Sequence, residues 1–168
     1  MRPKPETMTT GEMAAAFGFS SCESSQARTW IRAGHARVQN ARPGKGQDFA
    51  VPLSAVFAIT LGTTVLRHGM SGDAAAKIVR YLDRADVPGR LARGERFLVV
   101  QGERVWLASE VASIATGGEA VTVLMLTVAM QAFRQALERH RKHRQPQRLK
   151  QPKTKARRSR ACPQTVEA

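Results

Sequence analysis

The first third of the chain alternates short apolar stretches with glycines and hydroxyl residues, a pattern that is typical of short helices. Thr9 and Glu12 have the spacing of a capping box, in which the two side chains satisfy early amide groups of a helix. The mostly apolar residues 13–17 follow directly, and Gly18 provides a stop signal. This pattern predicts a first helix that ends at Gly18.

A second helix is predicted over 22–32, after a hydroxyl residue, Ser20 or Ser21, that can cap it. Its apolar positions recur at i, i+3 and i+4 and define an inner face, and Gly34 ends the helix. Two short helices joined by a few residues that include a glycine have the size of a helix-turn-helix. We expect the inner-face residues to pack in the core, and they are Ala27, Trp30 and Ile31.

A turn rich in Gly, Pro and basic residues lies at 41–46, between the segments 35–40 and 47–51. This composition predicts a basic β-hairpin, or wing, that follows the second helix. Two further helices are predicted over 55–67 and 73–82 from their helical spacing of apolar residues. Their inner faces carry Val56, Ile59, Val65 and Leu66 on the first helix and Ala74, Ile78, Tyr81 and Leu82 on the second.

The pattern changes in the second half of the chain. Residues 83–96 are polar and contain Pro and Gly, so they are predicted to form a linker. The stretches 97–100 and 104–107 flank a three-residue turn and predict a β-hairpin. A third short strand is predicted from Val121, and the sequence becomes helical near Thr127.

These elements predict an α+β fold that has one helical domain and an accessory region. We predict a flexible lead-in at 1–8, a winged helix-turn-helix domain at 9–82, and a linker at 83–96. A small strand-and-helix region for accessory contacts or oligomerisation follows at 97–138. Pro, Gln, Lys and Arg dominate the rest of the chain, which predicts a disordered basic tail at 139–168.

The charge of the chain indicates a polyanionic partner such as nucleic acid or an anionic membrane, because the 168 residues carry a formal net charge of +14. Residues 139–160 contain 11 Lys and Arg and no acidic residue, so the net charge of residues 1–138 is only +4. The longest apolar run, 120–130, is shorter than the roughly 20 residues that a membrane-spanning helix needs. The first residues also lack the apolar stretch of a secretory signal, so we expect a cytoplasmic, nucleoid-associated protein.

Three motifs occur in an order that resembles the DNA-binding domain of MerR-family proteins. The run 8–20, MTTGEMAAAFGFS, is similar to the opening helix and turn of that family. Residues 28–34, RTWIRAG, resemble its Arg, aromatic and Gly spacing at the end of the recognition helix, and residues 66–71, LRHGMS, resemble its Leu-Arg-x-Gly-x-Ser link. The resemblance covers residues 8–82 and implies a winged helix-turn-helix that binds double-stranded DNA.

A recognition helix needs short polar and Arg side chains on one face, where they contact base edges and phosphates. The second predicted helix supplies such residues, and the predicted wing supplies further cations. The alternative is that these residues form a solvated helix face and loop. The predicted DNA-binding residues are Ser24, Ser25, Gln26, Arg28, Thr29 and Arg32 on the helix, and Arg37, Arg42 and Lys45 on the wing.

Other candidate chemistry is weak. His140 and His143 have the spacing of two metal ligands on one helix face, but they lie in a basic run without a nearby carboxylate or Cys. Cys22 and Cys162 are the only cysteines and do not indicate a disulfide. No Ser/His/Asp set or carboxylate pair has a supporting motif. We therefore expect a protein that binds without catalysing a reaction, with no metal and no cofactor.

The sequence favours a sequence-specific DNA-binding protein that regulates transcription. Two alternatives use a similar winged domain: an excisionase-type recombination directionality factor and a phage small-terminase-like packaging protein. The apolar content of 97–138 is too high for a linker and predicts self-association, with a homodimer as the expected state. The candidates for that contact are Phe97, Val99, Val105, Leu107, Val123, Met125, Met130, Phe133 and Leu137. The alternative is that these residues form only an intramolecular core.

Overall fold

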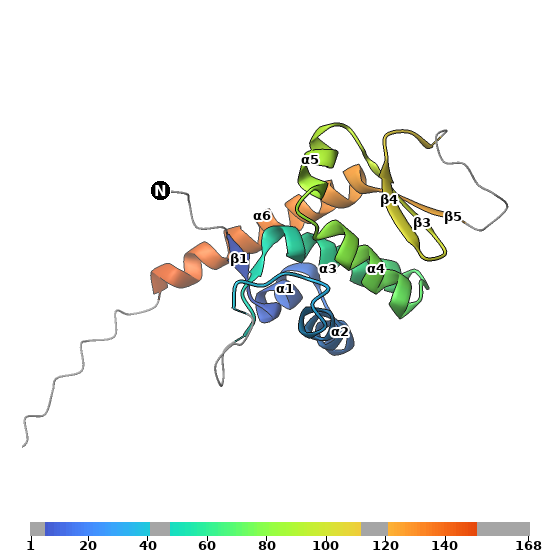
Figure 1. Ribbon diagram of the computed structural model, residues 1–168. Helices are drawn as coiled ribbons and strands as arrows, with labels where there is room; N and C mark the ends of the chain where they lie inside the picture. Colours follow the sequence, from blue (N-terminus) through green and yellow to red (C-terminus); the bar gives the residue numbers. More distant parts are fainter. Residues whose placement is uncertain (1–5, 41–47, 112–120, 151–168) are drawn as a thin grey trace, which may run out of the picture.

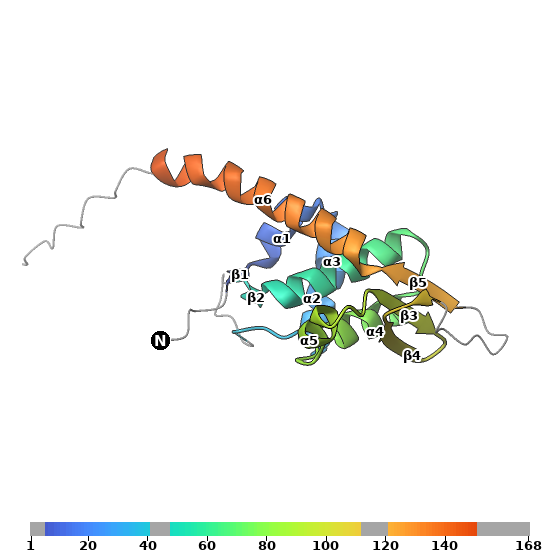
Figure 2. The same cartoon turned by 90° about the horizontal axis from the view of Figure 1, so that it is seen from above.

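The computed structural model describes residues 6–40, 48–111 and 121–150. In this part the chain has the mixed α+β character that the sequence predicts, with helices and two small antiparallel sheets. Figures 1 and 2 show helices α1 to α4 grouped together, a sheet at one end of the group, and the long helix α6 running along it. None of the helices in the described ranges is long and apolar enough to cross a membrane.

The first two helices begin and end where the sequence predicts. In α1 (Thr10–Phe17), the Glu12 amide donates to Thr9 Oγ1 at 3.1 Å and the Thr9 amide donates to Glu12 Oε2 at 2.8 Å. Gly18 then ends the helix at φ 65°, a left-handed conformation that favours glycine. A second capping box, between Ser20 and Glu23, opens α2 (Ser21–Arg32). The two helices are therefore joined by a short turn whose ends are both set by local hydrogen bonds.

Helices α3 (Leu53–Arg67) and α4 (Gly72–Leu82) pack closely against each other, and α2 contacts α3. Trp30 of α2 is only 2% exposed, which confirms the prediction that it belongs to the core. Gly62 of α3 allows this close approach, because a Cβ atom there would lie 2.5 Å from Val79 Cγ2 and 3.1 Å from the Trp30 ring. The predicted inner-face residues of both helices contribute to the same core, although Leu66 and Ala74 are only half-buried.

The predicted lead-in and wing differ from the structure. Strand β1 (Thr7–Met8) pairs with β2 (Val51–Pro52), and the Met8 side chain is buried, so a flexible lead-in up to residue 8 is wrong for Thr7 and Met8. Burial of the Met8 side chain and the pairing of β1 with β2 hold residues 7 and 8 in a defined position before α1. No strand is described within residues 35–40. This segment contacts residues 48–50 through the Gln39 amide, which donates to the Ala50 carbonyl at 2.9 Å, and through the Asn40 side chain.

The predicted linker contains a helix, and the strands behind it agree with the sequence. Helix α5 (Val87–Ala92) buries Val87, so a linker over the whole of 83–96 is wrong. Strands β3 (Phe97–Gln101) and β4 (Arg104–Ala108) form the predicted hairpin. The predicted third strand, β5 (Val121–Met125), pairs with the other side of β3, which gives the order β4-β3-β5.

Helix α6 (Leu126–Lys150) begins within one residue of the predicted change near Thr127. It continues through 139–150, so the prediction of disorder is wrong for these residues, while 151–168 lie outside the described part. Leu137 and Phe133 pack on the core and hold the helix along α1 and α3 (Figure 2). The Arg, Lys and Gln residues between 139 and 145 are good helix formers, so an anchored helix can continue at least to Pro146.

Candidate nucleic-acid interface

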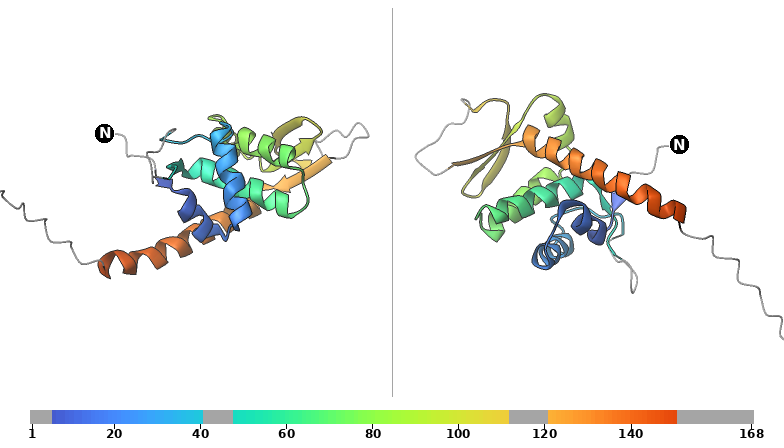
Figure 3. Two further views of the ribbon diagram at one scale, coloured as in Figure 1. Left: turned by 90° about the horizontal axis from the view of Figure 1, so that it is seen from below. Right: turned by 180° about the vertical axis from the view of Figure 1, so that it is seen from behind.

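The exposed side chains of α2 lie together on one face of the helix. Viewed from below, α2 lies in front of the other helices (Figure 3, left), and the side chains of this face are exposed. Glu23 is the only acidic residue of α2 and is not on this face, where Arg28 and Arg32 supply positive charge. We call this surface the outward face of α2; its exposed residues are Ser21, Cys22, Ser25, Arg28, Thr29 and Arg32.

Arg28 is held in place from the beginning of α1. Its Nε donates to Thr10 Oγ1 at 3.3 Å, and its Nη2 lies 3.9 Å from Asp48 Oδ2. Burial opposes ionisation of Asp48, but hydrogen bonds from Thr10, Gly11 and Phe49 outweigh it and lower the pKa of this carboxyl. The carboxylate thus orients Arg28 and partly neutralises it, while 46% of the Arg28 side chain remains exposed.

Arg32 is the cation that this arrangement leaves available on α2. Its side chain is exposed, and no hydrogen bond or ion pair joins its guanidinium to another residue of the described part. The neighbouring hydroxyl groups are already used as donors within the helix: Ser24 Oγ donates to the Ser20 carbonyl at 2.9 Å, and Thr29 Oγ1 to the Ser25 carbonyl at 3.1 Å. Ser24 and Gln26 are half-buried and lie at the borders of the outward face.

The predicted wing residues are not gathered on α2. Arg37 lines a shallow hollow beside Arg32, but its amide donates to Asp83 Oδ2 at 2.6 Å and its Nε to the same oxygen at 3.1 Å. Asp83 is buried at the end of α4, so this pair fastens the segment after α2 to the helical core. Arg42 and Lys45 lie outside the described residues.

An ion pair between α2 and α3 sets the position of the turn. Arg67 of α3 pairs with Glu23, and its Nη2 donates to the Gly18 carbonyl at 3.0 Å. The Arg67 hydrogen bond, followed by the Ser20 amide, lowers the pKa of Glu23 to about 2. We call this contact the Glu23–Arg67 clamp. It ties the beginning of α2 and the preceding turn to α3, so the direction of α2 is fixed at its N-terminal end.

The comparisons with known proteins add no assignment: the sequence matches no protein-family model, and no curated protein or solved structure matches the chain. Sequence reasoning missed Ser21 and Cys22, which share the outward face with the predicted residues. The spacing of residues along the helix could have placed Ser21 on this face, since Ser21, Ser25, Arg28 and Arg32 follow one another at intervals of three or four. Within the described ranges, no group of three His, Cys, Asp or Glu residues could hold a metal ion.

The residues proposed for self-association fall into different environments. Val99, Leu107 and Leu137 are buried in the protein's own core, so their prediction as contact residues is wrong for this chain. Val123 and Met125 of β5 are 37% and 53% exposed, and the neighbouring Val128, which the sequence did not single out, is 61% exposed. Self-association through this region stays a prediction, now confined to β5 and the beginning of α6.

Proposed function

We propose that the protein binds double-stranded DNA with the outward face of α2 in the major groove. The observation that carries this proposal is an outer helix whose exposed face combines Arg28 and Arg32 with hydroxyl groups and has no acidic side chain. The major groove admits one α-helix, and Arg is the side chain that most often reads a guanine edge. The two capping boxes and the Glu23–Arg67 clamp supply the rigid support that base reading requires.

The finer role that we propose is sequence-specific regulation of transcription at the bacterial nucleoid. It rests on the helix-turn-helix order of α1 and α2, on the resemblance of residues 8–82 to MerR-family domains, and on the net charge of +14. Footprinting across the DNA upstream of the protein's own gene tests this role. A protected site there supports regulation, and protection only at an integration or packaging site would replace regulation with one of the alternatives.

Arg32→Ala is the sharpest test of the α2 interface. The Arg32 side chain makes no hydrogen bond or ion pair within the described part, so its removal changes no such contact there. Arg28→Ala, by contrast, would also remove the hydrogen bond to Thr10. We expect Arg32→Ala to weaken binding to a site obtained by in vitro selection by about 1–3 kcal/mol, if Arg32 reads a base, with the fold unchanged. Fluorescence anisotropy on selected and scrambled duplexes measures both affinity and preference.

The matched control is Arg104→Ala, which removes the same charge from an exposed position on β4. This variant should keep the preference for the selected site. A folded Arg32→Ala protein with the affinity and preference of the parent would show that α2 is not the recognition element.

The basic end of the chain adds a separate prediction. Residues 151–168 carry five Lys and Arg and one Glu. We expect truncation after Lys150 to reduce the slope of log K against log salt by about 0.9 for each phosphate that these residues neutralise, because fewer counterions are released. Relative preference among sites should stay the same, since phosphate contacts do not read sequence.

A scrambled version of 151–168 with the same composition is the control for the truncation, and it should restore the salt dependence. Equal slopes for the full chain and the truncated chain would exclude the basic end as a DNA-binding arm. Binding titrations at several salt concentrations measure these slopes.

A further inference from the structure

A cavity of about 540 Å³ lies between α1, α3 and α6, on a different part of the molecule from the outward face of α2. Four phenylalanines from separate segments line it: Phe17 of α1, Phe19 of the turn, Phe57 of α3 and Phe133 of α6. The Phe17 and Phe133 rings are stacked with centroids 5.0 Å apart, and Phe57 meets Phe133 edge-on at 5.4 Å. This volume is within the usual range for small-molecule sites, roughly 300–1,000 Å³.

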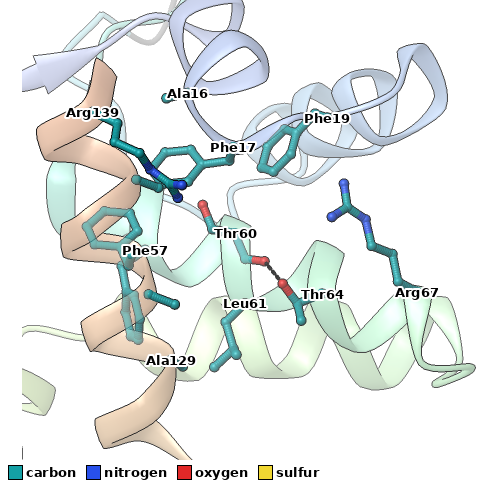
Figure 4. Close-up of a pocket in the computed structure, with 13 residues that line it drawn as sticks. Ala16, Phe17, Phe19, Phe57, Thr60, Leu61, Thr64, Arg67, Ala129 and Arg139 are labelled. Carbon is teal, nitrogen blue, oxygen red and sulfur yellow. Dashed lines mark hydrogen bonds between the residues drawn. The ribbon is translucent and has the colours of Figure 1, made fainter. Parts of the chain in front are cut away.

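Few polar groups of the cavity are free to bind a ligand. The Thr60 hydroxyl donates to the Val56 carbonyl and the Thr64 hydroxyl donates to the Thr60 carbonyl, each at 2.8 Å; Figure 4 shows the second of these bonds. The Arg67 guanidinium is committed to the Glu23–Arg67 clamp. A sugar or another polyhydroxylated ligand would lose its hydrogen bonds to water here without replacing them, so the body of a ligand must be apolar.

Arg139 supplies the one cation of the cavity that has no partner in the described part of the chain. Figure 4 shows its guanidinium directed from α6 toward Phe17 and Thr60. The lining contains no acidic residue, so this charge favours a negative group on a bound molecule. Apolar walls and one available guanidinium together fit a monoanion with a flat apolar body.

We propose that this cavity binds a small aromatic carboxylate, with its ring system among the phenylalanines and its carboxylate at Arg139. The Phe side chains provide faces and edges on which an aromatic ring can stack. The alanines of α6 leave the space open, because Ala129, Ala132 and Ala136 line the same wall. The site depends on α6 packing against α1 and does not depend on DNA binding by α2.

The test uses 1-naphthoate as the probe and the full chain, with binding measured by isothermal titration calorimetry. We expect saturable binding of one molecule per chain, with a dissociation constant on the order of 100 µM for a ligand of this size. The neutral analogue 1-naphthalenemethanol should bind about tenfold more weakly, because it lacks the charge-assisted hydrogen bond. Arg139→Gln should weaken naphthoate binding by a similar factor and leave binding of the neutral analogue unchanged.

Two further variants control for charge and for location. Arg134→Gln removes the same charge from an exposed position of α6 outside the cavity lining and should bind naphthoate like the parent. Ala132→Trp fills the cavity from an exposed position and should abolish binding, with circular dichroism used to verify the fold. The proposal is overturned by absence of saturable binding to the full chain, by Arg139→Gln binding like the parent, or by binding that survives Ala132→Trp. Loss of self-association in Ala132→Trp with no naphthoate binding to the parent would identify a second copy of the chain as the occupant instead.

Discussion

The helical region α1 to α4 and the later region of β3, β4, β5 and α6 are organised by different kinds of contact. In the first region, hydrogen bonds between near neighbours determine where α1 and α2 begin, and Gly18 determines where α1 ends. In the second region, β5 pairs with the distant β3, and α6 returns to pack on α1. Local signals therefore define the ends of α1 and α2, whereas contacts between distant segments place β5 and α6 in the later region.

The two regions are joined by a hydrogen-bonded seam around Tyr81 of α4. Its Oη accepts the Leu107 amide of β4 at 3.1 Å and Arg90 Nη1 at 2.6 Å. Arg90 Nη2 also donates to the Leu107 carbonyl at 3.2 Å. Because buried residues of both regions belong to one hydrophobic cluster, we expect the described part of the chain to unfold in a single transition.

The largest effect should come from removing the aromatic centre of the helical region. Trp30→Ala is expected to lower the free energy of unfolding by about 3–5 kcal/mol, because it leaves a cavity next to Gly62 and Val79. The Trp30 indole N–H has no acceptor in the described part of the chain, so the destabilisation comes from packing. Urea denaturation followed by circular dichroism measures the change.

Trp106 of β4 is the matched control in the later region, since it is only half-buried. Trp106→Ala should cost less than Trp30→Ala, and both variants should retain one transition. Two separated transitions in either variant would show that the regions fold independently.

A smaller effect is expected at the seam itself. Tyr81→Phe keeps the ring but removes the acceptor of the buried Leu107 amide and of Arg90, which should cost about 1–3 kcal/mol. Amide hydrogen exchange should accelerate at Leu107 more than at Leu98 of the central strand, whose side chain is fully buried. Unchanged exchange at Leu107 would mean that the Tyr81 hydroxyl does not couple α4 to the sheet.

These contacts explain which parts of the fold could be predicted from the sequence. The ends of α1 and α2, the β3–β4 hairpin and the start of α6 depend on spacings of a few residues, and they were predicted. The β1–β2 pair and the burial of Val99 could not be predicted, because both depend on partners that only the folded chain brings together. The extension of α6 beyond residue 138 could not be predicted for the same reason, since the contacts that hold α6 in place are with α1 and α3.

The candidate interface likewise contains residues that the sequence predicted and contacts that it could not predict. The outward face of α2 follows from helical periodicity, so the sequence predicted most of its residues, including Arg28 and Arg32. The pairing of Arg37 with Asp83 joins residues 46 positions apart, and no local pattern indicates it. The cavity was even harder to predict from the sequence, because its four phenylalanines come from four segments and Arg139 lies in a stretch that resembles a plain basic tail.

The smallest effect concerns the Glu23–Arg67 clamp, a long-range contact that ties the turn between α1 and α2 to α3. The pKa of Glu23 is about 2 in the folded protein and near 4.5 when the group is free. The folded value is the lower one, so the clamp stabilises the protein above pH 4.5 and loses this contribution as the pH falls toward 2. Because the pair lies near the surface, we expect it to contribute about 1 kcal/mol.

Glu23→Gln isolates the charge, since Gln at this position can still complete the capping box with Ser20. The variant should be less stable than the parent at pH 7, and the difference should shrink between pH 4.5 and 2 in urea denaturation at each pH. Glu103→Gln is the matched control, because Glu103 pairs with Lys77 but 87% of its side chain is exposed, so its substitution should leave stability unchanged. A difference between the parent and Glu23→Gln that stays constant from pH 7 to pH 2 would show that the Glu23 charge does not hold the turn, and that the capping box alone positions α2.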